Sequence, residues 1–286
     1  MSRLDDAKRS AKGAAHSAES SRAFEMAARA GYAANGVVHV LIGVIVLVVA
    51  LGGQGESDQS GALKAIAGAP FGFLLLWVLA IALWALGVWH LLEGVLVREA
   101  SGGRSDDVVD TAKREGSKWG RRVSEWGQAV VFIALGLIAA SVALGARVDS
   151  EEATDNASRG VLAIPGGSIV LGLIGLGVGI GGISFIVMGV MRSFEKKMSI
   201  PSRGVGPSVK ALGIVGFIAK GIALVIVGIL LLVAAVTVDP NAAGGLDAAI
   251  EAMLALPYGP WLTGAVGVGL IAYGVFCFFR ARFAKL

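Results

Sequence analysis

Three polar residues stand at equivalent places inside long apolar stretches of this 286-residue chain. They are Asn35, Gln128 and Lys220, and each lies eight residues before a glycine. Amide and ammonium groups are costly in hydrocarbon, so they turn inward, pair with one another or reach the interface. The spacing therefore predicts a polar layer inside a helical bundle, in which the lysine has the greatest need of a partner.

Two histidines and a glutamate extend this set. His39 lies one turn beyond the first of these polar residues, while His90 and Glu93 are three residues apart and share a helix face. An ammonium group in lipid must find a carboxylate or lose its proton. We expect Lys220 to pair with Glu93, with Glu125 as the second choice nearer the interface.

Three uses of this polar cluster remain open. It can be a structural network, a polar vestibule for ions or a small solute, or a haem site held by His39 and His90. Both histidines have glycine at i−3 and i+4, which leaves room for a flat ligand, although packed helices lie about 8–10 Å apart, which is tight for a porphyrin. The candidate residues are Asn35, His39, His90, Glu93, Gln128 and Lys220.

The chain carries no arrangement typical of an enzyme. It lacks a His/Cys/Asp group with metal-ligand spacing, a phosphate-binding loop with its lysine, and a serine nucleophile elbow. Its single cysteine, Cys277, lies in the last apolar stretch and has no partner for an intramolecular disulfide. We expect a non-enzymatic protein with no catalytic residues, no metal site and no cofactor beyond the haem alternative.

The elements that must position these groups are membrane-spanning helices. Hydrophobic residues make up 55% of the chain, charged residues only 16%, and the mean hydropathy is +0.75. At about 1.5 Å per residue, six charge-poor segments are long enough to cross a hydrocarbon core of about 30 Å. They cover roughly residues 31–52, 71–97, 124–146, 168–192, 209–236 and 260–280.

An internal repeat groups the six segments into hairpins. Three prolines each precede a glycine by 17 residues, and they open the turns Pro70-Phe71-Gly72, Pro165-Gly166-Gly167 and Pro257-Tyr258-Gly259. The repeat predicts an all-α polytopic membrane protein whose six transmembrane helices form three parallel hairpins with pseudo-threefold symmetry. Short helices are expected over residues 61–68 and 245–256, before two of the turns, and each proline is expected in the first turn of the returning helix.

The distribution of charge predicts the orientation. Of the 25 lysines and arginines, 21 lie in the N-terminal segment, the two long connections and the C-terminal tail. By the positive-inside rule, both termini are expected on the cytoplasmic side of the membrane. The polar N-terminal residues do not resemble a secretory signal, and the basic residues are explained by topology, so nucleic acid is not an expected partner.

The expected divisions of the chain follow the repeats. They are a cytoplasmic N-terminal segment (1–29), repeat 1 (30–97), a cytoplasmic connection (98–123), repeat 2 (124–192), a second connection (193–208) and repeat 3 (209–281). In the fourth apolar segment, the small-xxx-small pairs Gly175/Gly179 and Gly177/Gly181 predict close helix packing. The same face is a possible contact with a second protomer.

The repeat resembles a bacterial membrane family catalogued as domain of unknown function 1206. The resemblance covers nearly the whole chain from about residue 29 to 279, and the middle copy departs most from the pattern. It implies three two-helix repeats in a bacterial inner membrane and carries over no activity or catalytic residue. The matching segments are residues 30–36, 61–63, 70–72, 87–89, 219–221, 245–246, 257–259 and 272–276.

These observations predict a non-enzymatic integral membrane protein. We expect a structural or accessory component that contacts the lipid bilayer and binds a lipid, a membrane-protein partner or a second copy of itself. A small channel or transporter with a polar vestibule on the cytoplasmic side is the alternative, and a haem-binding bundle is the third possibility.

Overall fold

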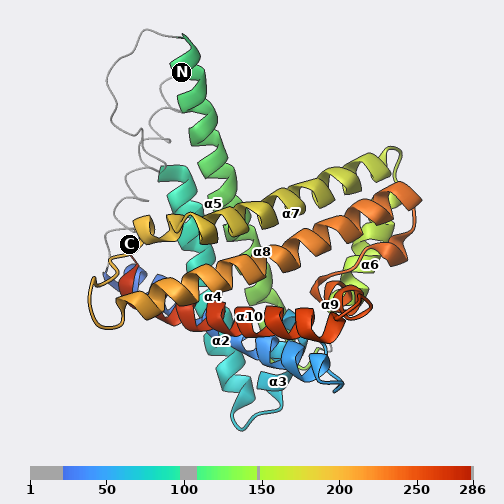
Figure 1. Ribbon diagram of the computed structural model, residues 1–286, viewed down its shortest axis with the longest axis horizontal. Coiled ribbons are helices and arrows are strands. Elements are labelled where there is room, and N and C mark those ends of the chain that lie inside the picture. The colour runs from blue at the N-terminus through green and yellow to red at the C-terminus, as the bar shows by residue number, and fades with distance from the viewer. Residues whose placement is uncertain (1–21, 97–107, 147–148, 285–286) are drawn as a thin grey trace.

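The computed structural model describes residues 22–96, 108–146 and 149–284, which are helical and contain no strand. Six long helices dominate the structure (Figure 1). They are α2 (Arg22–Ala50), α4 (Gly72–Leu96), α5 (Val108–Ala143), α7 (Gly167–Val190), α8 (Gly206–Thr237) and α10 (Gly259–Phe283). The shorter elements are α3 (Gln59–Ala67), α6 (Ser150–Leu162), η1 (Ser193–Lys197), η2 (Pro240–Ala242) and α9 (Leu246–Leu254).

All six long helices have the length and composition of membrane spans. Their apolar spans run from 20 residues in α5 to 32 residues in α8. At about 1.5 Å per residue, even the shortest reaches about 30 Å. The chain is therefore an all-α polytopic membrane protein, as the sequence predicts.

Two of the expected connections differ from the structure. Residues 108–123, expected as a helical part of the connection 98–123, are continuous with the membrane helix and form the first part of α5, whose apolar span begins only at Ser124. Residues 22–29 of the expected N-terminal segment begin α2, while residues 1–21 and 97–107 lie outside the described part. The two polar stretches continue the membrane helices without a break, because good helix formers extend a helix beyond the membrane core.

The three Pro-x-Gly turns share one backbone conformation. Their middle residues, Phe71, Gly166 and Tyr258, all have positive φ, of 62°, 77° and 62°. The returning helix begins at the following glycine, so the proline precedes the helix and does not occupy its first turn as expected. A Cβ on Gly72 would collide with the carbonyl oxygen of Ile66, which explains the glycine.

Short helices precede all three turns. α3 and α9 confirm the two that the sequence predicts, and α6 is a third that the prediction missed. The Asp58 side chain caps α3 by accepting from the Gly61 N–H at 3.0 Å. Asp247 of α9 accepts from the Ser57 N–H at 2.6 Å, which ties the first repeat to the third. Burial raises the pKa of the Asp247 carboxyl, the Ser57 N–H opposes this shift, and the charge of Asp58 adds to it.

The closest helix contacts join different repeats through glycines seven residues apart. Helices α7 and α8 run antiparallel, and Gly182 faces Gly221, where a Cβ on either would lie within 2.7 Å of the other's carbonyl oxygen. Gly175 faces Gly228 in the same manner one heptad away. Such backbone approach replaces the hydrophobic driving force that lipid cannot supply.

A second glycine seam joins the first helix to the last. Gly36 faces Gly274, and Gly43 faces Gly267, so α2 and α10 are also antiparallel neighbours at backbone distance. Beyond this seam, Arg29 donates to the carbonyl oxygen of Ala281 at 2.9 Å, which satisfies a terminal carbonyl of α10. This contact joins the first turns of α2 to the last turn of α10.

In the third seam, between α4 and α5, tryptophans cover the glycines. A Cβ on Gly136 would meet the indole of Trp84, and one on Gly94 would meet the indole of Trp126. Trp84 also donates across the seam to the carbonyl oxygen of Ile133 at 3.3 Å. These helices therefore pack through aromatic side chains laid over small residues.

The predicted packing glycines of α7 fall into two groups. Gly175 lies in the seam with α8, and the backbone of Gly179 lies against Gly228. Gly177 and Gly181 have no atom within 4 Å of an added Cβ. The seam repeats every seven residues, so the four-residue pairs identified only part of it.

The predicted pseudo-threefold arrangement is not confirmed. The extensive contacts run in the order α7, α8, α10, α2, α4, α5, so the middle hairpin has its two helices at opposite ends of the row. In Figure 1 the pair α4 and α5 crosses the other long helices at a steep angle. Helices of different repeats therefore pack against each other more extensively than the two helices of one hairpin do.

Candidate functional site

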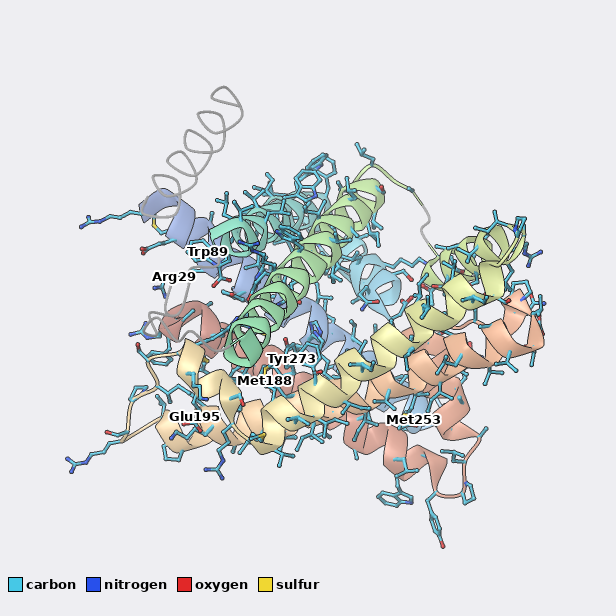
Figure 2. All side chains as sticks on the ribbon, turned by 90° about the horizontal axis from the view of Figure 1, so that it is seen from above. Arg29, Trp89, Met188, Glu195, Met253 and Tyr273 are labelled. Atoms are coloured by element: carbon cyan, nitrogen blue, oxygen red, sulfur yellow. The ribbon has the colours of Figure 1, made fainter. Side chains whose placement is uncertain are left out.

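The buried polar side chains of Asn35, His39, His90 and Glu125 lie toward one end of the bundle. We call this the basic end, because it carries Arg29, η1 and Arg280, and we call the end with α3, α6 and α9 the loop end. Figure 2 shows Arg29 and Glu195 at the basic end, Met253 toward the loop end, and Tyr273 between the helices. Two clusters occupy the basic half of the bundle.

The first cluster surrounds Lys220 of α8. Its Nζ lies 3.1 Å from Nε2 of His39 on α2. The ammonium also lies 4.4 Å from the ring centroid of Tyr273 and 5.3 Å from that of Phe185. An imidazole nitrogen and two aromatic faces are all attractive to a cation. We call Lys220, His39, Tyr273 and the neighbouring Asn35 and Cys277 the lysine–histidine cluster.

The hydrogen bonds of His39 determine which of its ring nitrogens carries the proton. Its Nδ1 lies 2.9 Å from the carbonyl oxygen of Asn35, which can only accept. The proton is therefore on Nδ1, and Nε2 carries the lone pair that accepts from the Lys220 ammonium. The imidazole is neutral in this arrangement, and Lys220 donates to its Nε2.

The remaining polar groups of this cluster bond one another. The Asn35 amide nitrogen donates to Cys277 Sγ at 3.5 Å, and both side chains are buried. The imidazole of His39 lies 4.8 Å from the Tyr273 ring, centroid to centroid. Phe194, Phe217 and Phe276 form the wall behind these groups. The cluster is thus a packed network with an aromatic backing.

The second cluster joins α4 and α5. His90 Nδ1 lies 2.7 Å from Oε2 of Glu125 and 3.6 Å from Oε2 of Glu93. His90 is stacked on Phe132, with ring centroids 5.4 Å apart, and its Nε2 has no hydrogen-bond partner. Lys197 of η1 reaches the other oxygen of Glu125, at 2.9 Å. We call His90, Glu93, Glu125 and Lys197 the carboxylate–histidine cluster.

A tyrosine and an arginine lie between the two clusters. Arg280 of α10 donates to the hydroxyl of Tyr32 at 3.3 Å, and its guanidinium lies 4.3 Å from the centroid of that ring. Tyr32 in turn makes an edge contact with His90, at 6.3 Å between centroids. Polar and aromatic contacts therefore extend from the carboxylate–histidine cluster to α10, which also carries Tyr273 and Cys277.

The predicted pair of Lys220 and Glu93 is wrong, since the two residues belong to different clusters. Sequence spacing gives depth along a helix but not the neighbour it faces, and the lysine faces α2 and α10. Glu125, the second choice, pairs with Lys197 instead. Of the other predicted residues, Asn35 and His39 join the lysine, whereas the amide of Gln128 bonds its own helix.

Sequence reasoning missed several members of these clusters. Tyr32, Tyr273 and Arg280 were given no role, although each lies beside a predicted residue in space. Lys197 was counted only as a charge in a connection. The one available signal was their position near the same helix ends as the predicted residues, and this does not identify partners.

The glycines beside the two histidines do not leave open room. The space above Gly36 and Gly43 is filled by the backbone of α10, and that above Gly87 and Gly94 by side chains of α5. The Nε2 of His39 is already bonded to Lys220. The argument for a flat ligand therefore loses its spatial basis.

Directly beyond Lys220 toward the loop end lies a layer of buried apolar side chains, and the buried hydroxyl of Thr263 lies further along α10. One and two turns beyond His39 lie Ile42 and Val46, and the corresponding buried positions of α10 are Leu270 and Val266. They belong to one core cluster with Ala223 of α8. The lysine–histidine cluster is thus bordered on this side by a hydrophobic layer, which interrupts any polar path through the bundle.

Comparison with known proteins agrees with this repeated architecture. The uncharacterized protein YxxB of Bacillus subtilis (strain 168) is 29% identical over 260 residues, which cover 90% of each chain. No solved structure matches the chain. Three blocks, residues 30–96, 126–192 and 215–284, match the model of one family. The chain therefore belongs to the family described as Domain of Unknown Function (DUF1206), of which it carries three copies.

Proposed function

We propose that this protein is a non-enzymatic structural or accessory component of the bacterial plasma membrane. The observation that carries the proposal is the sealed interior. Lys220, the most deeply placed charge, is satisfied by His39 and Tyr273, and a buried apolar layer lies beyond it. A channel or transporter needs a continuous polar path or a hydrated cavity at this level, because unsolvated ions are very costly in hydrocarbon.

The basic end is placed in the cytoplasm under this proposal. The support is the concentration of lysine and arginine there, together with the Bacillus relative. Lipid contacts the exposed apolar faces of the long helices, and the protein binds a phospholipid, a membrane-protein partner or a second copy of itself. The glycine seams give such a component a rigid frame.

Flux through reconstituted protein tests the sealed interior. The purified full chain in phospholipid vesicles should leak protons and potassium ions no faster than vesicles without protein, with gramicidin as the positive control. Lys220→Met should leave this leak unchanged. Flux above the empty vesicles that disappears in Lys220→Met would overturn the proposal and establish a conducting pathway.

Binding is tested on the same preparation. Native mass spectrometry should show a homo-oligomer, retained phospholipid or both after mild detergent extraction. A lipid-free monomer that also conducts ions would leave the accessory role without support.

A further inference from the structure

We propose that His90, Glu93 and Glu125 form a binding site for a divalent first-row transition-metal ion. This inference is independent of the proposed function, since a sealed accessory protein and a channel can each hold such an ion. Among the described residues, these three are the one group of His, Cys, Asp and Glu side chains whose ligand atoms lie within 4.8 Å of one another.

The geometry is close to that of a bound ion. Ligand atoms about 2.0–2.2 Å from a metal lie about 3.0–3.5 Å from each other. His90 Nδ1 lies 2.7 Å from Oε2 of Glu125 and 3.6 Å from Oε2 of Glu93, which bracket this range. Small side-chain movements therefore suffice to place one ion between the three atoms.

The ligand set favours a particular class of ion. One imidazole nitrogen with two carboxylate oxygens suits Zn²⁺, Mn²⁺, Fe²⁺ or Co²⁺, whereas Mg²⁺ prefers oxygen ligands alone. His90 and Glu93 project from one face of α4, and Glu125 comes from α5. The seam between these two helices holds the set in place, as rigid elements do in metal sites.

The charges leave a place for a cation. Lys197 contacts Oε1 of Glu125 and leaves Oε2 facing the histidine, while Arg280 acts on Glu93 from a longer distance. Glu93 has only His90 as an ion-pair partner in the described part of the chain. In the described part of the chain, Oε2 of Glu93 and Oε2 of Glu125 face His90 with no lysine or arginine in contact, and a divalent ion would bond both oxygens.

His90 is free to change its proton arrangement. On ion binding the neutral ring changes tautomer: Nδ1 gives up its proton, Nε2 takes one up, and the Nδ1 lone pair binds the ion. Because Nε2 has no partner, moving a proton to that nitrogen breaks no existing hydrogen bond. Access is from the side of Glu93, whose side chain is 33% exposed, whereas the side chain of His90 is 1% exposed.

The test uses the full chain, purified in detergent and freed of metal with a chelator. Co²⁺ is the spectroscopic probe, and Zn²⁺ is then used to displace it. We expect one equivalent of Co²⁺ to produce visible d–d absorption bands, and Zn²⁺ to abolish them, while Mg²⁺ has no effect. Absence of bands together with no saturable Zn²⁺ binding by calorimetry would overturn the proposal.

Two carboxyl variants test whether Zn²⁺ binds at this site specifically or at acidic groups of the basic end in general. Glu93→Gln removes the most exposed ligand, so the fold should survive, and Zn²⁺ affinity should fall at least about tenfold. Glu195→Gln is the matched control, because Glu195 pairs with Lys210 at 2.9 Å near the same end of the bundle. Equal loss of affinity in both variants would mean diffuse surface binding and would overturn the assignment.

A lysine variant distinguishes a metal site from a purely structural ion pair. Lys197→Met removes the cation that competes for Glu125, so Zn²⁺ should bind several-fold more tightly. If Lys197 acts only as a structural partner that organises the carboxylate, the same change would weaken binding. A change in either direction therefore supports Glu125 as a ligand, and an unchanged Zn²⁺ affinity would overturn it.

Discussion

Replacing His39 with leucine should destabilise the fold much more than replacing Lys220 with methionine. The lysine ammonium donates to His39 Nε2 at 3.1 Å and has no carboxylate within ion-pair distance among the described residues. In His39→Leu the buried charge loses its acceptor, and a hydrogen bond to a charged group contributes about 1.5–3 kcal/mol.

The methionine variant combines two opposing effects. It leaves His39 Nε2 without a donor, which costs about 1–3 kcal/mol, but it also removes the desolvation cost of a buried ammonium group. We expect the net change in the free energy of unfolding to stay within about 1 kcal/mol, because the two effects are of similar size. The double variant should lose less stability than His39→Leu alone.

The assay is equilibrium unfolding in SDS of the two single variants, the double variant and the native chain. A third combination tests the alternative pairing directly. Lys220→Met and Glu93→Gln should be additive within about 0.5 kcal/mol, since the two side chains lie in separate clusters. A loss of about 3–5 kcal/mol in Lys220→Met, with strong coupling to Glu93, would be the behaviour of a buried ion pair and would refute this reasoning.

The remaining predictions concern the glycine seam and the orientation. Gly182→Ala puts a Cβ 2.7 Å from a backbone oxygen of α8 and should lower stability by about 1–3 kcal/mol, whereas Gly177→Ala meets nothing within 4 Å and should cause no loss. Equal losses in SDS unfolding would contradict the seam. Cysteine at exposed Gln54 or Asn241 should react with an impermeant maleimide on intact cells, and cysteine at Ser202 only after lysis; the buried Cys277 should stay unreactive. Reversed labelling would invert the proposed topology.

Much of the helical framework could be predicted from the sequence because it depends on local properties. Long charge-poor segments must be helical in lipid, where every backbone polar group needs a partner within its own segment. The Pro-x-Gly turns could also be located by their spacing. The third short helix, α6, was missed, because its polar and acidic sequence resembles a loop.

The candidate site could be predicted only as a set of residues. The sequence singled out His39, Lys220, His90 and Glu93, and all four lie at least partly buried near the basic end. It did not reveal that they form two groups. Polar residues at the same depth on different helices can face any neighbour, and no periodicity along one helix reports which neighbour that is.

The glycine seams could be predicted only in part from the sequence. Glycines seven residues apart, such as Gly36 and Gly43, were visible in the sequence, but their partners on another helix were not. The sequence by itself determined which segments cross the membrane, where they turn and which polar groups they carry, because hydropathy and turn chemistry act locally. Only the tertiary structure decided that Lys220 meets His39 and that Glu125 joins His90, because those contacts depend on which helix backbones approach closely enough to pack.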